Sequence, residues 1–135
     1  MDLENALRIS AAGMQVQAVR LRVVAENLAN QDSTGQSAGA DPYRRKTVTF
    51  ANKLDRQMGA ESVEVRRIGT APGEFPQVQD PSHPAADARG YVKQPNVDSL
   101  VEMMDMREAQ RSYSANLSVL ETTRGMLTRT IEALR

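Results

Sequence analysis

The C-terminal part of the chain constrains the fold most strongly, because it carries one long helical pattern without interruption. No proline follows Pro95, and apolar residues recur at alternating steps of four and three as far as position 134. This stripe consists of Met103, Met106, Tyr113, Leu117, Leu120, Leu127, Ile131 and Leu134, with breaks at Ser99, Gln110 and Arg124. A helix of about 36 residues is roughly 55 Å long, which is too long to be enclosed in a 135-residue globule. We therefore predict a coiled-coil-like helix over residues 96–135.

The start of this helix has two candidate caps. Ser99 and Glu102 have the spacing of a capping box, in which each side chain accepts a backbone N–H of the first turn. Asp98 or Asn96 offers an alternative cap. Either choice places the start of the helix near residue 99.

A second helical pattern opens the chain and predicts a helix over residues 1–31, with Asp2 placed to cap its start. Its stripe consists of Leu7, Ala11, Met14, Ala18, Leu21, Ala25 and Leu28. A core helix of a bundle and an inter-subunit coiled coil both fit this pattern. Two helices with one stripe each could pair and still leave flanking apolar residues exposed, which favours further partners. These flanking residues are Val16, Val23, Val24, Val101, Met104, Val119 and Met126.

The middle segment, residues 32–95, is predicted to be rich in loops with short strands. Small, polar and glycine residues fill positions 31–42, which is typical of a loop. A β-like stretch ends near Phe50, and apolar and polar residues alternate over 62–66. Five prolines between residues 70 and 95 favour extended backbone. We expect a mainly α fold, in which the two long helices pair as an antiparallel coiled-coil-like hairpin around this small β-containing segment.

Composition narrows the partners and the chemistry. The formal net charge is zero and both signs occur in every segment, so no charged block predicts a nucleic-acid or membrane partner. The absence of cysteine excludes disulfides and a cysteine nucleophile. No stretch is long and apolar enough for a membrane span or a cleaved signal peptide. We expect a protein that is either cytoplasmic or exported without a cleaved leader.

The single histidine limits what the chain could catalyse. His83, with Asp80 and Asp87, could offer one nitrogen and two carboxylates to a metal. Prolines on both sides of His83 indicate a rigid turn instead, and most pairs of nucleophile and base lack a second member. We therefore predict no catalytic residue, no metal site and no cofactor, and keep a metal-dependent enzyme at His83 as an alternative.

The basic triplet Arg44-Arg45-Lys46 supports another alternative, a homodimeric coiled-coil regulator that binds nucleic acid. A nucleic-acid interface concentrates basic residues beyond the local balance, whereas Asp41, Asp55 and other acidic residues lie in the same segment. An ordinary solvated surface is therefore the favoured interpretation.

Three motifs together resemble the bacterial flagellar rod, hook and axial proteins. They are Ala11-Ala12-Gly13-Met14, the helix exit Leu28-Ala29-Asn30-Gln31-Asp32-Ser33-Thr34-Gly35, and the pattern Glu102-Met103-x-x-Met106-x-x-Ala109-x-Arg111-x-Tyr113-x-Ala115-Asn116. The block from Asp80 to Val97, which includes Pro95-Asn96-Val97, is most similar to the proximal rod subunits of that family. The chain departs from the family pattern in the insertion before Tyr43 and at Gln79, where an aromatic residue is common.

The resemblance implies a structural subunit that transmits torque in the periplasmic part of the basal body. Its helices would lie side by side, and subunits would stack through an interface that does not close into a ring, giving a hetero-oligomeric helical assembly. The implied partners are other proximal and distal rod proteins, the adaptor to the membrane-embedded rotor ring, and the flagellar type III export apparatus. The termini would be partly disordered before assembly. The residues expected to serve packing and assembly are Leu7, Ala11, Met14, Ala18, Leu21, Ala25, Leu28, Asn30, Asn96, Met103, Met106, Tyr113, Asn116, Leu117, Leu120, Leu127, Ile131 and Leu134.

Overall fold

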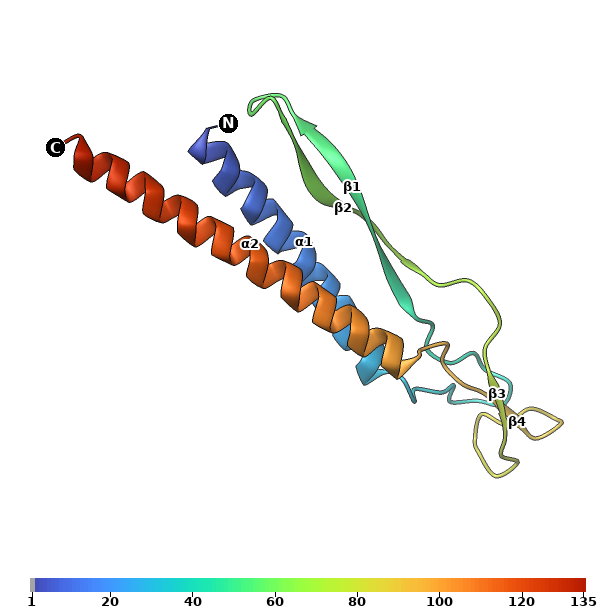
Figure 1. The fold of residues 1–135 in the computed structure, drawn as a ribbon. Helices are drawn as coiled ribbons and strands as arrows, with labels where there is room; N and C mark the ends of the chain where they lie inside the picture. The colour runs from blue at the N-terminus through green and yellow to red at the C-terminus, as the bar shows by residue number, and fades with distance from the viewer. Residues whose placement is uncertain (1) are drawn as a thin grey trace. The chain divides into compact units, whose positions relative to one another are not determined.

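A computed structural model describes residues 2–135, which form a helix at each end of the chain and two small sheets between them. The elements follow the order α1 (Leu3–Ala29), β1 (Lys46–Asp55), β2 (Ala60–Thr70), β3 (Gln77–Gln79), β4 (Tyr91–Lys93) and α2 (Ser99–Ala133) (Figure 1). The expected mainly α fold with a β-containing middle segment is therefore confirmed.

The chain divides into two compact units, each built from segments that are distant in the sequence. The first, called here the terminal unit, comprises the chain up to Leu21, Val48–Arg67 and Met106–Arg135. The second, the loop unit, comprises Arg22–Thr47 and Ile68–Asp105. Both helices and both long strands begin in one unit and end in the other.

Side-chain caps fix the starts of both helices. Asp2 accepts a hydrogen bond from the backbone N–H of Glu4 through Oδ1 (3.3 Å), as predicted. For α2, Asp98 Oδ1 accepts from the N–H of Leu100 (3.0 Å). The alternative cap is thus confirmed, and the capping box with Glu102 is wrong, because the Glu102 carboxylate bonds elsewhere in the loop unit.

The two long strands extend the predicted β-like stretches and pair as one two-stranded sheet. β-branched and aromatic residues such as Val48, Phe50 and Val63 favour this pleated structure. Asp55 shapes the turn between them, because its Oδ1 accepts from the N–H of Gln57 at 2.9 Å. Gly59 then adopts a left-handed φ of 63°, a conformation that glycine tolerates without strain.

A second, smaller sheet lies in the proline-rich segment, where no strand was predicted. β3 pairs antiparallel with β4, and Val78 lies opposite Val92. Val92 is buried, whereas every residue of β3 is exposed. Each strand has only three residues, too few to show an alternating pattern.

The buried face of α1 differs from its predicted stripe. Val16, Val23 and Val24 are buried, so their predicted exposure is wrong. The three alanines of the stripe, Ala11, Ala18 and Ala25, are exposed, and Leu7, Met14, Leu21 and Leu28 are half-buried. Valines remove more apolar area from water than alanines do, which favours burying the valine face.

The buried face of α2 also differs from its predicted stripe. Glu102, Ala109 and Thr123 are buried at spacings of one or two heptads. Of the predicted stripe, Met106, Tyr113 and Leu120 are half-buried, whereas Met103, Leu117, Leu127, Ile131 and Leu134 are exposed. The flanking residues Val101, Met104, Val119 and Met126 are exposed, as predicted. No helix of the described residues is long and apolar enough to cross a membrane.

Candidate assembly site

A buried amide lies at the centre of the loop unit. Asn27, near the end of α1, is 1% exposed. Its Nδ2 donates to the backbone carbonyl of Lys46 (2.9 Å) and to Glu102 Oε2 (3.3 Å). Its Oδ1 accepts from the Tyr43 hydroxyl (2.7 Å) and from the Lys46 N–H (2.9 Å). The side chain of Asn27 therefore holds α1, the start of β1 and the start of α2 together.

Glu102 is the charged member of this cluster and is 0% exposed. Its Oε1 accepts a hydrogen bond from Arg45 Nε, which also makes this contact an ion pair. Arg45 also reaches Asp105 Oδ2 through a second nitrogen (3.4 Å). A buried carboxylate requires such a partner, because an unpaired charge in the interior is strongly unfavourable.

Asn96 binds the backbone of Arg45. Its Oδ1 accepts from the Arg45 backbone N–H at 2.7 Å, and its Nδ2 donates to the carbonyl of Ala71 (3.4 Å). Asn96 was expected to be an assembly residue. Within the loop unit it joins the segment before α2 to the start of β1, and this contact gives it a structural role.

An ion pair at the edge of the cluster shifts two pKa values. Lys46 Nζ lies 2.9 Å from Glu26 Oε2. This hydrogen bond and the attraction between the charges lower the pKa of Glu26 and raise the pKa of Lys46. Burial raises the pKa of the neighbouring Tyr43 hydroxyl. All three shifts favour the states that hold the cluster together at neutral pH.

Asn30 ends α1 in the way that the helix-exit motif suggests. Its Nδ2 donates to the carbonyl of Glu26 (2.8 Å), and its Oδ1 accepts from the Ser33 hydroxyl (3.0 Å). The Ser33 N–H also donates to the Asn30 carbonyl. These bonds satisfy backbone groups that a helix end leaves free.

The basic triplet turns inward, to partners in the chain. Besides Arg45 and Lys46, Arg44 donates from Nη1 to the carbonyls of Ala71 and Gly73, both at 3.0 Å. Its guanidinium also lies 4.2 Å from the centre of the Phe75 ring. Each of the three basic side chains therefore already has a partner within the loop unit, and none is free to bind a phosphate.

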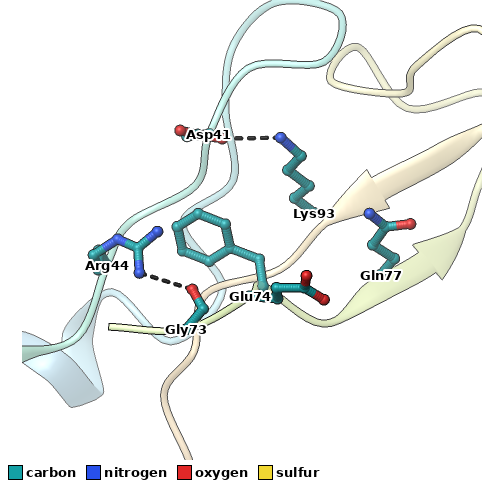
Figure 2. A pocket seen from close by; sticks show the side chains of 7 residues that line it. Asp41, Arg44, Gly73, Glu74, Gln77 and Lys93 are labelled. Carbon is teal, nitrogen blue, oxygen red and sulfur yellow. Dashed lines mark hydrogen bonds and ion pairs between the residues drawn. The ribbon is translucent and has the colours of Figure 1, made fainter. Parts of the chain in front are cut away.

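Arg44 forms one wall of a pocket of about 370 Å³ in the loop unit (Figure 2). Lys93 and Asp41, which also line the pocket, form an ion pair at 3.0 Å. The lining residues are Asp41, Arg44, Gly73, Glu74, Phe75, Gln77 and Lys93. Its charged side chains are two cations and two carboxylates, so the pocket favours neither sign of ligand.

His83 and its neighbouring carboxylates shape local turns. His83 Nδ1 accepts from the Ala85 N–H (3.0 Å), and Nε2 lies 3.4 Å from the Thr34 hydroxyl. Asp80 Oδ1 accepts from the Ser82 hydroxyl (2.7 Å), and Asp87 Oδ1 accepts from the Tyr91 N–H (3.0 Å). Across residues 2–135, no group of three or more His, Cys, Asp or Glu side chains is placed to hold a metal ion.

In the terminal unit, the two helices contact each other closely at a glycine. An ideal Cβ atom on Gly13 would lie 2.8 Å from Asn116 Nδ2. About two turns further along α1, Arg20 and Glu108 form an ion pair at 3.4 Å. Gly13 explains part of the Ala-Ala-Gly-Met motif, because only a residue without a side chain lets Asn116 lie there.

The apolar residues that remain exposed are concentrated on α2. Leu100, Val101, Met103 and Met104 are exposed in the loop unit, and Leu117, Val119, Met126, Leu127, Ile131 and Leu134 are exposed in the terminal unit. Met103 is 55% exposed and Leu134 is 82% exposed. This concentration is the arrangement expected of a surface that a partner covers.

Asn27 and Glu102 were not predicted as site residues, and Arg45 was considered only as a nucleic-acid contact in the alternative interpretation. One signal in the sequence points to Asn27, because it follows Val16, Val23 and Val24 on the same face of the helix. A polar residue on an apolar face requires hydrogen-bond partners when it is buried.

Known proteins resemble the chain over nearly its whole length. Residues 88–133 match the family model described as the C-terminal region of flagellar basal body rod FlgEFG proteins. The flagellar basal-body rod protein FlgC of Agrobacterium fabrum is 53% identical over 133 residues, which are 98% of this chain and 96% of that protein. The FlgC proteins of Aquifex aeolicus and Bacillus subtilis are 42% and 38% identical, each over 98% of both chains.

Proposed function

Because the chain belongs to the FlgC family of flagellar basal-body rod proteins, we propose that it acts in the proximal part of the rod, within a helical assembly. As a member of that family it is a structural subunit of the basal body and not an enzyme, and it assembles with other rod components. Its contribution is a stiff element between the rotor and the distal rod and hook, and long packed helices supply that stiffness.

The observation that carries this proposal is the apolar surface of α2. Leu117 is 37% exposed and Val119 is 49% exposed, on two sides of the helix. Covering both sides requires more than one neighbour, which a helical stack of subunits provides. The packing residues named from the sequence serve in this way: the exposed ones contact neighbours, and the half-buried ones support the fold.

Antiparallel pairing of α1 and α2 is the second part of the proposal. In the terminal unit, Gly13 contacts Asn116 and Arg20 contacts Glu108. A later residue of α1 therefore contacts an earlier residue of α2, which is the order of an antiparallel pair. In the loop unit, Asn27 near the end of α1 contacts Glu102 near the start of α2. Within each unit, these contacts support antiparallel pairing of the two helices.

The neighbours of the subunit follow from its place in the rod. We infer contacts with other proximal and distal rod proteins and with the adaptor to the membrane-embedded rotor ring. Transport through the flagellar type III apparatus without a cleaved signal peptide would deliver the subunit to the periplasmic part of the rod. Partly disordered termini before assembly would keep the apolar surface of α2 from associating too early.

The nucleic-acid alternative is not supported. Its three proposed contact residues, Arg44, Arg45 and Lys46, are held by carbonyls, carboxylates and an aromatic ring within the loop unit. Freeing them for phosphates would leave the buried carboxylate of Glu102 without its cation.

Charged substitutions on adjacent residues of α2 test the proposal. Leu117→Asp and Val119→Asp each place a carboxylate on an exposed apolar position, and Ser118→Asp places one on the exposed polar position between them. In a strain that lacks the native gene, we expect the first two variants to abolish motility and rod formation, seen by electron microscopy of basal bodies. The Ser118→Asp variant should assemble.

Circular dichroism of the purified variants separates assembly from folding. All three should retain the helical signal of the unmodified chain, because each position is exposed. Normal rods with both Leu117→Asp and Val119→Asp would contradict the proposed role of this surface.

A further inference from the structure

The side-chain charges cancel over the whole chain but not within each unit. The terminal unit holds eleven Lys and Arg residues against eight Asp and Glu residues, whereas the loop unit holds six against nine. The terminal unit therefore has a formal side-chain charge of +3, and the loop unit has one of −3. Opposite charges on two parts of one chain favour contact between the unlike parts of different copies.

Ion pairs within the terminal unit leave mainly cations free. Arg8, Arg20 and Lys53 are paired with carboxylates of the same unit. The other basic residues are exposed and, among the described residues of this unit, have no ion-pair partner: Arg56, Arg66, Arg67, Arg107, Arg111, Arg124, Arg129 and Arg135. The terminal unit thus offers a surplus of free guanidinium groups to a partner.

In the loop unit, the free charges are mainly carboxylates. Every basic residue there except Arg89 is held by an ion pair or by carbonyls within the unit. Among the described residues of the loop unit, the carboxylates without an ion pair are Asp32, Glu74, Asp80, Asp87 and Asp98. The last three accept hydrogen bonds in their own turns. Only Asp32 and Glu74 are exposed and accept no hydrogen bond in this unit, so both can bind an external cation.

Two of the free cations of the terminal unit meet at one pocket. Arg66 and Arg67, near the end of β2, line a pocket of about 380 Å³ together with Thr49 of β1. Guanidinium groups donate pairs of hydrogen bonds to carboxylates, and a threonine hydroxyl adds a further donor. Of the described residues, no Asp or Glu lines this pocket. It therefore favours a carboxylate supplied from outside the unit.

We propose that the pocket at Arg66 and Arg67 of one copy binds the loop unit of a second copy through Asp32 and Glu74. This inference rests on the helical assembly proposed above and identifies one neighbour in it, another copy of the same chain. The contact joins two unlike surfaces, and each copy carries both. It can therefore repeat from copy to copy without closing into a pair, as a helical stack requires.

A contact between charges predicts how association depends on salt. The screening length falls from about 30 Å at 0.01 M salt to about 3 Å at 1 M salt. We therefore expect the purified chain to associate at low salt and to dissociate at high salt, as measured by sedimentation velocity. Association through the apolar surface of α2 would not weaken in this way, because salt does not screen the burial of apolar surface.

Two charge-reversal variants test the contact. The first carries Arg66→Glu with Arg67→Glu, and the second carries Asp32→Lys with Glu74→Lys. Each variant has like charges on the two surfaces that should meet, so neither should associate with itself. An equimolar mixture should associate at low salt, because each variant supplies the charge that the other has lost. All four positions are exposed, so circular dichroism should show the helical signal of the unmodified chain.

Arg107→Glu with Arg111→Glu is the matched control. It changes the charge of the terminal unit by the same amount as the first variant, but on α2 and outside the pocket. The control should keep the salt-sensitive association that the first variant loses. This comparison separates a local contact at Arg66 and Arg67 from an effect of net charge.

Each contrary result overturns the inference. These results are no salt-sensitive association of the unmodified chain, self-association of either reversal variant, no association of their mixture, or an equal loss in the control. Binding of the unmodified chain to phosphatidylglycerol vesicles without self-association would assign the basic surface to a membrane instead. The Leu117→Asp and Val119→Asp test is independent of all these results, so failure of this contact is distinct from failure of the proposed function.

Discussion

Gly13 lies directly against the side chain of Asn116. A Cβ atom on Gly13 would come within 2.8 Å of Asn116 Nδ2 and within 3.0 Å of its Cγ. Asn116 is held in place because its Nδ2 donates to the carbonyl of Ser112 at 3.1 Å. The close approach of α1 and α2 in the terminal unit therefore depends on a residue without a side chain.

We predict that Gly13→Ala destabilises the chain by about 1–3 kcal/mol, because the added methyl group overpacks this contact. The matched control is Gly125→Ala in α2, where a Cβ atom would meet nothing within 4 Å. That change should stabilise the helix by up to about 1 kcal/mol. Urea unfolding followed by circular dichroism measures both.

A double variant identifies the cause of the Gly13→Ala effect. Asn116→Ala should remove most of the penalty when it is combined with Gly13→Ala, because the two sites are in contact. Equal stabilisation by Gly13→Ala and Gly125→Ala would contradict the close contact.

The Arg45–Glu102 pair makes a second prediction. Arg45→Ala leaves a carboxylate that is 0% exposed without its cation, so we expect a loss of about 3–5 kcal/mol. Arg107→Ala, at an exposed position on α2, should change stability by less than about 0.5 kcal/mol. The midpoints of urea unfolding report both values. Similar small effects of the two substitutions would mean that Glu102 is not paired in solution.

The Glu26–Lys46 ion pair predicts a specific pH dependence. Lys46 holds the pKa of Glu26 below its ordinary value of 4.5. The stability that Glu26 contributes is therefore present above pH 4.5 and is lost as the pH falls through the lowered pKa. Glu26→Gln should flatten this acid limb of the stability curve, measured from urea midpoints at a series of pH values.

At alkaline pH, the stability contributed by the Glu26–Lys46 pair changes with pH in the opposite direction. Glu26 raises the pKa of Lys46 above 10.5, so this contribution is present below pH 10.5 and is lost as the pH rises further. Lys46→Gln should flatten the same acid limb as Glu26→Gln, because either change removes the pair. An unaltered acid limb in both variants would show that the pair does not persist in solution.

The helices were predictable because their signals are local, but the faces they bury were not. Ala11 and Ala18 are one heptad apart, and so are Val16 and Val23, so periodicity alone supports either face of α1. Burial of the valine face depends on what packs against it. That information lies in segments far along the chain.

The polar cluster around Asn27 and Glu102 could not be predicted from the sequence for a related reason. Asn27 and Glu102 are 75 residues apart, and their contact depends on the path of the loop that carries Arg45. Glu102 also fitted a capping box with Ser99, a plausible local use of the same carboxylate. A local motif was therefore preferred over a distant contact that no spacing reveals.

The last turns of α2 give the final prediction. After Thr123 no residue of the helix is buried, and Leu127, Ile131 and Leu134 are exposed. Few buried contacts mean a low free energy of local opening. In the free subunit, we expect backbone amides from residue 127 onward to exchange with deuterium much faster than those between Ala109 and Thr123.

Assembly should reverse this difference. If a neighbouring rod subunit covers Leu127, Ile131 and Leu134, the same amides should become protected in isolated basal bodies, because the covered helix opens less often. Hydrogen exchange with mass spectrometry on both states measures the change. Strong protection of the terminal turns in the free subunit would contradict the prediction, because it would show that these turns are stable without a partner to cover them.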